Sequence, residues 1–381
     1  MTAFDLALPR RVIFGPGRAD ELGGLLPALG RGVLLCTGRE PSRHRRLLDG
    51  IDPVAVVTVA HEPTVDDVRE AMREGRAAGP DVVVAIGGGS VLDLGKAMAV
   101  LLGNGTDPMD HLEVVGRGMP IERPPLPFVA VPTTAGTGAE ATANATLRSA
   151  EHGIKASIRS PSMLAAVALV DPLLTMTCPP AVTASSGLDA LTQCLEPYVS
   201  RRANPATDAV ATEGLRRGAR ALRRAYARGD DREAREDMSL CSLFGGVALA
   251  NAKLGAVHGL AGVIGGLVDA PHGAVCAALL APVVRANVQA LREHEPGSPA
   301  LARYAHVARL LTGRDDATLD EGVDWVRDTV AALHVSPLGA MGLAPAQFVE
   351  VAEKAAGSSS MQGNPVRLRR EDLVAVLEAA S

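Results

Sequence analysis

The chain has 381 residues, 47% hydrophobic and 21% charged, which is typical of globular proteins and long enough for two domains. A net charge of −5 and an aromatic content of 2% argue against a nucleic-acid partner, which would need basic surfaces and stacking rings. Five scattered cysteines without a CxxC pair, and an N-terminus without a secretory signal, lead us to expect a cytoplasmic protein. The longest apolar run, Gly273–Val284, is too short to span a bilayer and predicts a buried helix, so no membrane partner is expected.

The first half of the chain alternates short Val-rich runs with helical patterns. Thr64–Ala78 carries charges spaced as on an exposed helix, and it lies between two of the apolar runs. This rhythm predicts right-handed βαβ units and a parallel sheet, and continuously apolar strands predict a sheet covered on both faces. The predicted strands are Gly32–Thr37, Val54–Val59, Val82–Ile86 and Pro127–Val131.

A glycine-rich turn follows the third predicted strand. Asp81–Lys96 reads DVVVAIGGGSVLDLGK, so the strand runs into Gly87, Gly88 and Gly89 and then into a helix that Ser90 can cap. Glycines let the backbone approach a ligand, and a helix N-terminus offers free N–H groups that suit a pyrophosphate. The GxGxxG fingerprint is absent, and a purely structural β–α turn is the alternative interpretation.

A second turn follows the fourth predicted strand and reads VPTTAGTGAE over Val131–Glu140. The hydroxyls of Thr133, Thr134 and Thr137 are suited to hydrogen-bonding a sugar-phosphate, although a Thr-rich helix cap would look similar. Two such turns at neighbouring strand ends would converge on one crevice, which is where doubly wound sheets bind ligands.

Beyond Asp171-Pro172 the pattern becomes helical and shows no strand-like alternation. We place the boundary near Pro179-Pro180, which gives an α/β domain over 1–178 and an all-helical domain over 179–381. The predicted helices are 180–201, 203–227, 231–252, 255–267, 273–292, 299–312, 317–333, 345–357 and 369–380.

A carboxylate, an amide and two imidazoles stand out in the helical half. Asp189 and Gln193 are four residues apart and share a helix face, and His258 and His272 each precede a glycine in an apolar stretch. Pro271 and two glycines separate the histidines, so they must come from different elements. Such donors suit Fe²⁺, Zn²⁺ or Mn²⁺. The alternative is that both histidines are core residues capping helix ends.

Taken together, these segments resemble the group III metal-dependent (iron-containing) alcohol dehydrogenases over nearly the whole chain. GGGSVLDLGKA matches the family's GGGSxxDxxKA, and PTTAGTGAE resembles its PTTAGTGSE. The segment from Ile154 to Pro172 looks like the family's next segment. SGLDALTQCLEPYVS looks like its metal helix, and GAVHGLAGVIGG and PHGAVCA look like its two His segments. The set in this order is far more specific than any one motif.

The resemblance implies a dehydroquinate-synthase-like α/β domain that binds the dinucleotide and an all-α domain that binds the metal. Asp189, His258 and His272 fall on metal-ligand positions, where they would also be catalytic, and Gln193 falls where the family usually has a third His. Gly262 is a second departure, since some members carry a His there. A neutral amide is a poorer donor than imidazole, so we expect weaker metal binding than at a three-His site.

The loop after the first predicted strand bears on the choice of cofactor. Gly38 stands where NAD-specific sites often place an acid, and Arg39, Ser42 and Arg43 can pair with a 2′-phosphate. We therefore expect NADPH to be used better than NADH, an exposed loop being the alternative. The resemblance places Lys155 at the nicotinamide-side ribose. The expected cofactor-binding residues are Gly38, Arg39, Gly87, Gly88, Gly89, Ser90, Asp93, Thr133, Thr134, Thr137 and Lys155.

The expected function is hydride transfer between NAD(P)(H) and a small alcohol, aldehyde or ketone at a Fe²⁺ or Zn²⁺ site, in a homodimer. In this mechanism the metal acts as a Lewis acid on the substrate oxygen. The chain also shows similarity to maleylacetate reductase, which reduces an unsaturated oxo acid without a metal. Asp189 and the single His258 favour the alcohol dehydrogenase side, because that relative has Asn and a His pair there. A polyol dehydrogenase and an inactive nucleotide-binding protein are further alternatives.

Overall fold

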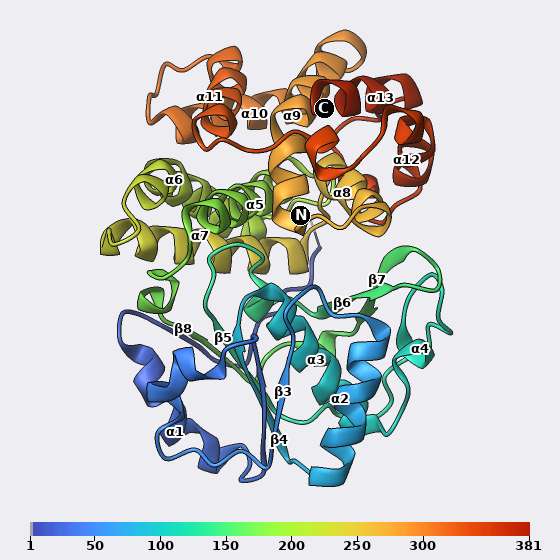
Figure 1. Ribbon diagram of the computed structural model, residues 1–381. Coiled ribbons are helices and arrows are strands. Elements are labelled where there is room, and N and C mark those ends of the chain that lie inside the picture. The colour runs from blue at the N-terminus through green and yellow to red at the C-terminus, as the bar shows by residue number, and fades with distance from the viewer. Residues whose placement is uncertain (1–2) are drawn as a thin grey trace. The chain divides into compact units, whose positions relative to one another are not determined.

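The computed structural model of the chain describes residues 3–381 and divides into two compact units (Figure 1). The α/β unit comprises Ala7–Thr134 and Gly138–Met176. The helical unit comprises Thr177–Ser381, the short segment Ala135–Thr137 and the described part of the first six residues. The predicted fold class, an α/β domain followed by an all-α domain, is confirmed. The boundary between residues 178 and 179 stays a prediction.

A six-stranded parallel sheet forms the centre of the α/β unit, in the order β1-β8-β5-β4-β2-β3. The four predicted strands are present, whereas β1 and β8 were not predicted, because three or four residues carry too little pattern. The prediction of a continuously buried strand was wrong for β3, an edge strand on which Val56 is 44% exposed and which follows Val54, itself 46% exposed. The strands are β1 Val12–Phe14, β2 Val33–Thr37, β3 Ala55–Thr58, β4 Val82–Gly87, β5 Phe128–Pro132 and β8 Val167–Val170.

Both faces of this sheet are covered, as its apolar strands predicted. Alternate residues such as Leu34 and Val83 pack against α2 (Val65–Ala78) and α3 (Gly89–Asn104). Their neighbours, such as Leu35, face a second core that includes residues of α1 (Leu22–Leu25). Figure 1 shows the sheet between α1 on one side and α2 and α3 on the other.

The helix predicted over Thr64–Ala78 is α2, and its ends follow from its sequence. The Thr64 side chain accepts a hydrogen bond from Asp67 N and the Asp67 side chain accepts one from Thr64 N, which forms a capping box. Gly79, with a φ of 62°, ends the helix in the left-handed conformation that suits glycine. A short helix α4 (Pro108–His111) and a two-stranded hairpin, β6 (Asn144–Ser149) and β7 (Ile154–Arg159), complete the unit.

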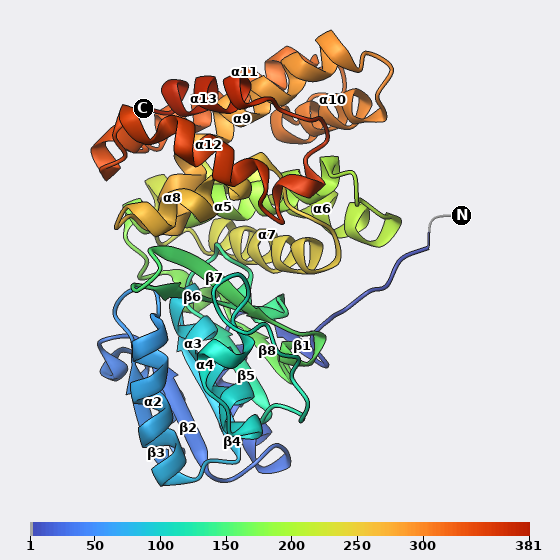
Figure 2. The ribbon, with the colours of Figure 1, turned by 90° about the vertical axis from the view of Figure 1, so that its right-hand side faces the viewer.

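The described part of the helical unit contains helices and no strands, and every predicted helix is present to within a few residues (Figure 2). One large apolar core, which includes residues of α5 to α13, holds the unit together. The helices are α5 Pro180–Val199, α6 Pro205–Ala227, α7 Arg232–Asn251, α8 Ala256–Leu267, α9 His272–His294, α10 Pro299–Thr312, α11 Leu319–Ala332, α12 Phe348–Ala356 and α13 Arg370–Ala379.

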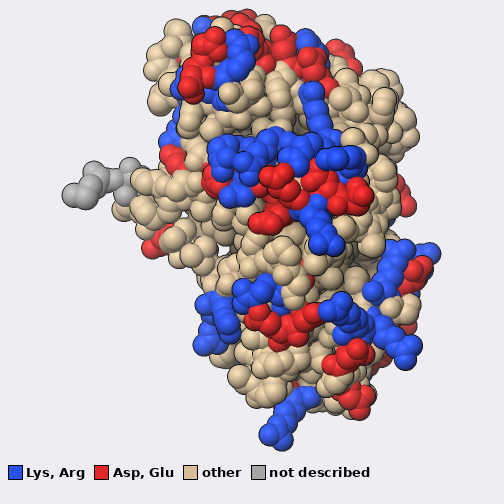
Figure 3. Space-filling model, turned by 90° about the vertical axis from the view of Figure 1, so that its left-hand side faces the viewer, with Lys and Arg blue, Asp and Glu red and all other residues tan. Residues whose placement is uncertain are grey.

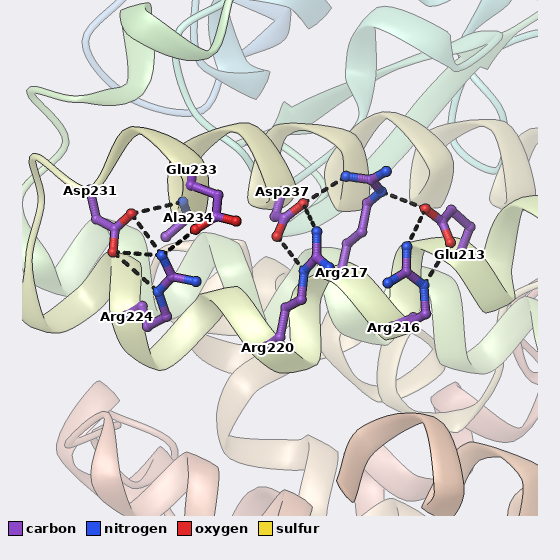
Figure 4. Close-up of polar contacts among 9 residues, drawn as sticks. All are labelled: Glu213, Arg216, Arg217, Arg220, Arg224, Asp231, Glu233, Ala234 and Asp237. Atoms are coloured by element: carbon purple, nitrogen blue, oxygen red, sulfur yellow. Dashed lines mark hydrogen bonds and ion pairs between the residues drawn. The ribbon is translucent and has the colours of Figure 1, made fainter. Parts of the chain in front are cut away.

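Ion pairs join α6 to the start of α7 and to its buried face. Asp237, whose side chain is only 2% exposed, accepts hydrogen bonds from Arg217 and Arg220 of α6 (Figure 4). Asp231, the N-cap of α7, is held by Arg224. On the face drawn in Figure 3, basic side chains form a band beside acidic ones. Arg217, Arg220 and Arg224 of α6 are therefore neutralised by neighbouring acids.

Helix α9 contains the longest apolar run of the sequence and is long and apolar enough to cross a membrane by length and composition. However, 67% of its most apolar window is buried inside the structure, as in the core helix of a globular unit. The bent pair α7 and α8 passes the same test. The prediction that Gly273–Val284 forms a buried helix is thus confirmed, with Val275, Leu279 and Val283 at most 1% exposed.

Candidate functional site

The helical unit brings the four predicted metal-ligating residues together from three helices. Asp189 and Gln193 lie one turn apart on α5, His258 lies on α8, and His272 is the first residue of α9. Pro271 precedes α9 as its N-cap, so the two histidines come from separate helices as predicted. The Asp189, Gln193 and His258 side chains are buried, so the cluster lies within the core of the unit.

The polar atoms of this cluster are close to one another. The Gln193 side-chain amide donates to Asp189 Oδ2 over 3.0 Å, and Asp189 Oδ1 lies 3.3 Å from His258 Nε2. The rings of His258 and His272 have centroids 5.5 Å apart. One potential ligand atom from each of Asp189, His258, His272 and Cys276 lies within 4.8 Å of the others. Side chains distant in sequence therefore surround a space that a single ion could fill.

Three of these buried atoms have no hydrogen-bond partner among the described residues: Asp189 Oδ1, Gln193 Oε1 and His258 Nε2. The 3.3 Å between Asp189 Oδ1 and His258 Nε2 is within ion-pair reach, but the two atoms form no hydrogen bond of good geometry. An unsatisfied buried polar atom costs about 1–3 kcal/mol, so three in one place need an explanation. A divalent cation would satisfy Asp189 Oδ1 and His258 Nε2, which lie 3.3 Å apart, and carboxylate, amide and imidazole donors fit such an ion.

Glu196, which the sequence analysis missed, holds His258 in place. Its Oε2 lies 2.7 Å from His258 Nδ1, and its Oε1 accepts a hydrogen bond from Val257 N over 2.7 Å. With Nδ1 bound to the carboxylate, Nε2 is the nitrogen left for a metal, as in many carboxylate–histidine–metal arrangements. Glu196 lies two helical turns after Asp189, so its spacing on α5 is the signal that could have identified it.

Burial and charge act in opposite directions on the acidic and basic groups of the cluster. Burial opposes ionisation of Asp189, but the nearby His258 imidazole, 3.3 Å away, and the charge of His272 hold its pKa below the usual value. Burial likewise opposes the charged form of His258, while Cys276, Asp189 and Glu196 raise its pKa well above the usual value. Cys276 also raises the pKa of His272, to about 9. The environment thus favours positive charge at the centre of the cluster.

The glycine-rich turn joins β4 to α3 and leaves the helix N-terminus without a side-chain cap. Gly88 is the N-cap and α3 begins at Gly89, so the prediction that Ser90 caps the helix was wrong. Ser90 lies inside the first turn, where its hydroxyl cannot take the N-cap role. A Cβ on Gly87 would lie 2.5 Å from the Val91 side chain, so no larger residue fits there. The N–H groups of the first turn, which have no partner within the helix, and the dipole of α3 suit an anion.

Glycine also sets the distance between α3 and the sheet. A Cβ on Gly95 would lie 2.7 Å from the Ala85 side chain of β4 and 2.7 Å from the ring of Phe128 on β5. Gly95 therefore gives the close helix–strand packing that the third glycine of the common fingerprint provides elsewhere.

The two predicted turns lie side by side, because β4 and β5 are hydrogen-bonded neighbours. Thr133 N donates to Gly87 O over 2.9 Å, and a Cβ on Gly88 would lie 3.3 Å from the Thr134 side chain. From β2 the chain continues to β3 on one side of the sheet, and from β4 it continues to β5 on the other side. The carboxyl ends of β2 and β4 therefore form the topological switch point, which is where such sheets bind ligands. Thr137 groups with the helical unit, and its cofactor role stays a prediction.

Two other predicted cofactor residues have partners within the α/β unit. Asp93 accepts a hydrogen bond from Thr146 N over 3.1 Å and pairs with the buried Lys96 ammonium over 2.9 Å. Lys155, on β7, forms an ion pair with Glu62. Both residues therefore stabilise the unit itself, and their roles in cofactor binding stay predictions.

The loop after β2 carries the residues that were predicted to select the cofactor. Arg39 is exposed and forms no ion pair among the described residues, whereas Arg43 pairs with Glu40 over 2.9 Å. Gly38 has open space where a Cβ would stand. This loop therefore offers the Arg39 guanidinium without an ion-pair partner among the described residues, and no carboxylate at position 38.

Comparison with known proteins agrees with both units. The iron-containing alcohol dehydrogenase model matches residues 9–172, and the C-terminal model of the Fe-containing alcohol dehydrogenase family matches residues 183–381. A 1,3-propanediol dehydrogenase of Klebsiella pneumoniae is 32% identical over 99% of this chain and 98% of its own length.

Solved structures agree over the full length. A 1,3-propanediol oxidoreductase, 30% identical, superposes with a TM-score of 0.89 and full coverage of both chains. Sulfoacetaldehyde reductase from Bifidobacterium kashiwanohense, solved in complex with NAD⁺, is 29% identical, with a TM-score of 0.86 and coverage of 99% and 98%. The chain belongs to the iron-containing alcohol dehydrogenase family and is an alcohol dehydrogenase-type oxidoreductase.

Proposed function

We propose that this protein transfers a hydride between NADP(H) and a small alcohol or its aldehyde or ketone, at a divalent-metal centre held by Asp189, Gln193, His258 and His272. The observation that supports it most is the set of three unpartnered buried atoms, Asp189 Oδ1, Gln193 Oε1 and His258 Nε2. In a purely structural cluster Gln193 Oε1 would stay desolvated without a partner, and Asp189 Oδ1 and His258 Nε2 would have only their 3.3 Å contact with each other.

The residues around the centre orient the donors. Glu196 binds His258 Nδ1 and so directs His258 Nε2 toward the metal position. The Gln193 amide donates to Asp189 Oδ2 and so directs Asp189 Oδ1 toward it. When bound, a divalent ion acts as a Lewis acid toward an alcohol or carbonyl oxygen. The buried position of Asp189 and His258 keeps bulk water away from the donors.

The α/β unit would bind the cofactor's pyrophosphate through backbone groups rather than charged side chains. The uncapped N-terminus of α3 and the glycines before it would receive the pyrophosphate, and Thr133 and Thr134 lie beside them. The exposed Arg39 would pair with a 2′-phosphate, which is why we propose NADPH as the preferred cofactor.

The test combines metal removal with a cofactor comparison. Purified protein is assayed with a panel of short aldehydes and both reduced cofactors, then stripped with a chelator and reloaded with Zn²⁺ or Fe²⁺. We expect a higher kcat/KM with NADPH than with NADH. We also expect activity to be lost on stripping and restored by reloading.

Two results would contradict the proposal separately. A higher kcat/KM with NADH would exclude the cofactor assignment alone. Full activity in stripped protein, with no metal by elemental analysis, would instead support metal-free reduction of the maleylacetate-reductase type, in which Gln193 would hydrogen-bond the substrate.

A cytoplasmic location and a homodimer also stay predictions, and light scattering on the purified protein would test the dimer.

A further inference from the structure

Cys276 lies in the metal-binding cluster, although neither the sequence analysis nor the family pattern gave it a role. It is fully buried on α9, one helical turn after His272, so that the two side chains share a helix face. Its Sγ lies 3.5 Å from His272 Nε2 and within 4.8 Å of donor atoms of Asp189 and His258. The thiol therefore borders the same space as Asp189 Oδ1 and His258 Nε2, two buried atoms without partners.

Gln193 is the weaker donor at this centre. Its amide nitrogen is already bound to Asp189 Oδ2, which leaves only a neutral carbonyl oxygen, Oε1. A thiolate is a stronger and softer donor, and borderline ions such as Zn²⁺ and Co²⁺ bind it readily. Of these two side chains, Cys276 thus offers the better replacement for the family's third imidazole.

We propose that Cys276 binds the metal directly, so that the centre is an Asp–His–His–Cys site with Gln193 as an accessory donor. The inference depends on the proposed function, because it assumes that a metal occupies this cluster. On binding, the S–H bond breaks, sulfur keeps the electron pair as a metal ligand, and the proton is released to solvent.

A thiolate ligand changes both the charge and the selectivity of the centre. Asp189 and Cys276 together contribute two negative charges, which neutralise a divalent ion, whereas Asp189 alone leaves one positive charge. Soft thiolate also favours Zn²⁺ over Fe²⁺ more strongly than amide oxygen does. The protein should therefore select Zn²⁺ over Fe²⁺ by a wider margin with Cys276 than without it.

The sharpest test is the optical spectrum of the cobalt-loaded full-length protein, because a Co²⁺–thiolate bond gives an intense charge-transfer band in the near ultraviolet. We expect the stripped wild-type protein to bind one equivalent of Co²⁺ and to show this band. Cys276→Ser, and Cys276→Ala as a second variant, should lose the band and bind Co²⁺ at least tenfold more weakly, since even loss of an outer-sphere partner costs roughly 10–100-fold. The Zn²⁺/Fe²⁺ affinity ratio should fall in both.

Cys241→Ser is the matched control, because Cys241 is a buried free cysteine of the same unit on α7. It should keep both the band and the affinity. One Co²⁺ bound to wild-type protein without a thiolate band would overturn the inference and leave the proposed function intact, and this result needs no variant. A band that persists in either Cys276 variant would also overturn it. Failure of wild-type protein to bind Co²⁺ would overturn the inference and the proposed metal centre together.

Discussion

The two units prepare their binding sites by opposite means. In the α/β unit the candidate cofactor site is made of backbone, namely an uncapped helix N-terminus reached through Gly87 and Gly88. In the helical unit the candidate metal site is made of side chains from α5, α8 and α9, with atoms left unpartnered in the core. A backbone site depends on the absence of side chains, and a side-chain site depends on their exact chemistry, so each should fail under a different kind of substitution.

The largest effect should come from removing a metal ligand. His272→Ala leaves the centre without one of its two imidazoles, so metal binding should be lost and kcat/KM should fall by about 10³-fold or more, consistent with the several kcal/mol a catalytic metal supplies. NADPH affinity, measured by fluorescence titration, should change little. His306→Ala, at a histidine of the same unit that contacts Tyr198, is the control. A variant that keeps its metal and its activity would remove His272 from the site.

The complementary variant is Gly89→Val at the first residue of α3. A branched side chain at this helix N-terminus should displace phosphate oxygens and weaken NADPH binding roughly 100-fold, while Co²⁺ binding stays unchanged. Gly24→Val, at a helical glycine with open space around it, is the matched control. Unchanged NADPH affinity in a folded variant would show that the turn is only structural, and the contrast between the units would then fail.

A smaller loss is expected from Glu196→Gln, which keeps the shape of the side chain but removes the charge opposite His258 Nδ1. Metal affinity should fall roughly 10–100-fold, as for other outer-sphere partners of a ligating His. Chelator competition with Zn²⁺ measures this directly. Glu350→Gln, at an exposed ion pair on α12, should leave the affinity unchanged. Equal affinities in the two variants would mean that Glu196 serves helix packing alone.

The smallest expected effect is a gain in metal affinity. Gln193→His places an imidazole where an amide now stands and should tighten Zn²⁺ binding by roughly tenfold or less. The gain is limited because the substitution also removes the hydrogen bond from Gln193 to Asp189. Gln289→His on the exposed side of α9 controls for an added histidine. If Gln193→His binds Zn²⁺ no better than wild type, donor strength at position 193 does not limit the centre.

How much the sequence predicted differs between the same two units. Long strands and helices were predicted because hydrophobic periodicity extends over many residues, and Asp189 and Gln193 were paired by helical spacing alone. Strands β1 and β8 are too short for such a signal, and the edge position of β3 depends on sheet order. Helical spacing places Glu196 on the face of Asp189 and Cys276 on the face of His272, but their contacts with His258 and with the rest of the cluster depend on the packing of α5 against α8 and α9. The cap predicted at Ser90 was misplaced by two residues, because glycine can begin a helix without a capping side chain.

A final consequence concerns the order in which the centre is assembled. Asn364, far from the metal ligands in sequence, accepts a hydrogen bond from Ala256 N at the start of α8 and bonds with Asn287 of α9. Gly255 leaves room for it, since a Cβ there would lie 3.0 Å from Asn364 Oδ1. Asn364 thus joins α8 and α9, the helices that carry His258 and His272, and the ribosome adds it after both helices. A nascent chain that ends before position 364 lacks this fastening, so we expect the metal to enter a nearly finished fold rather than to nucleate it.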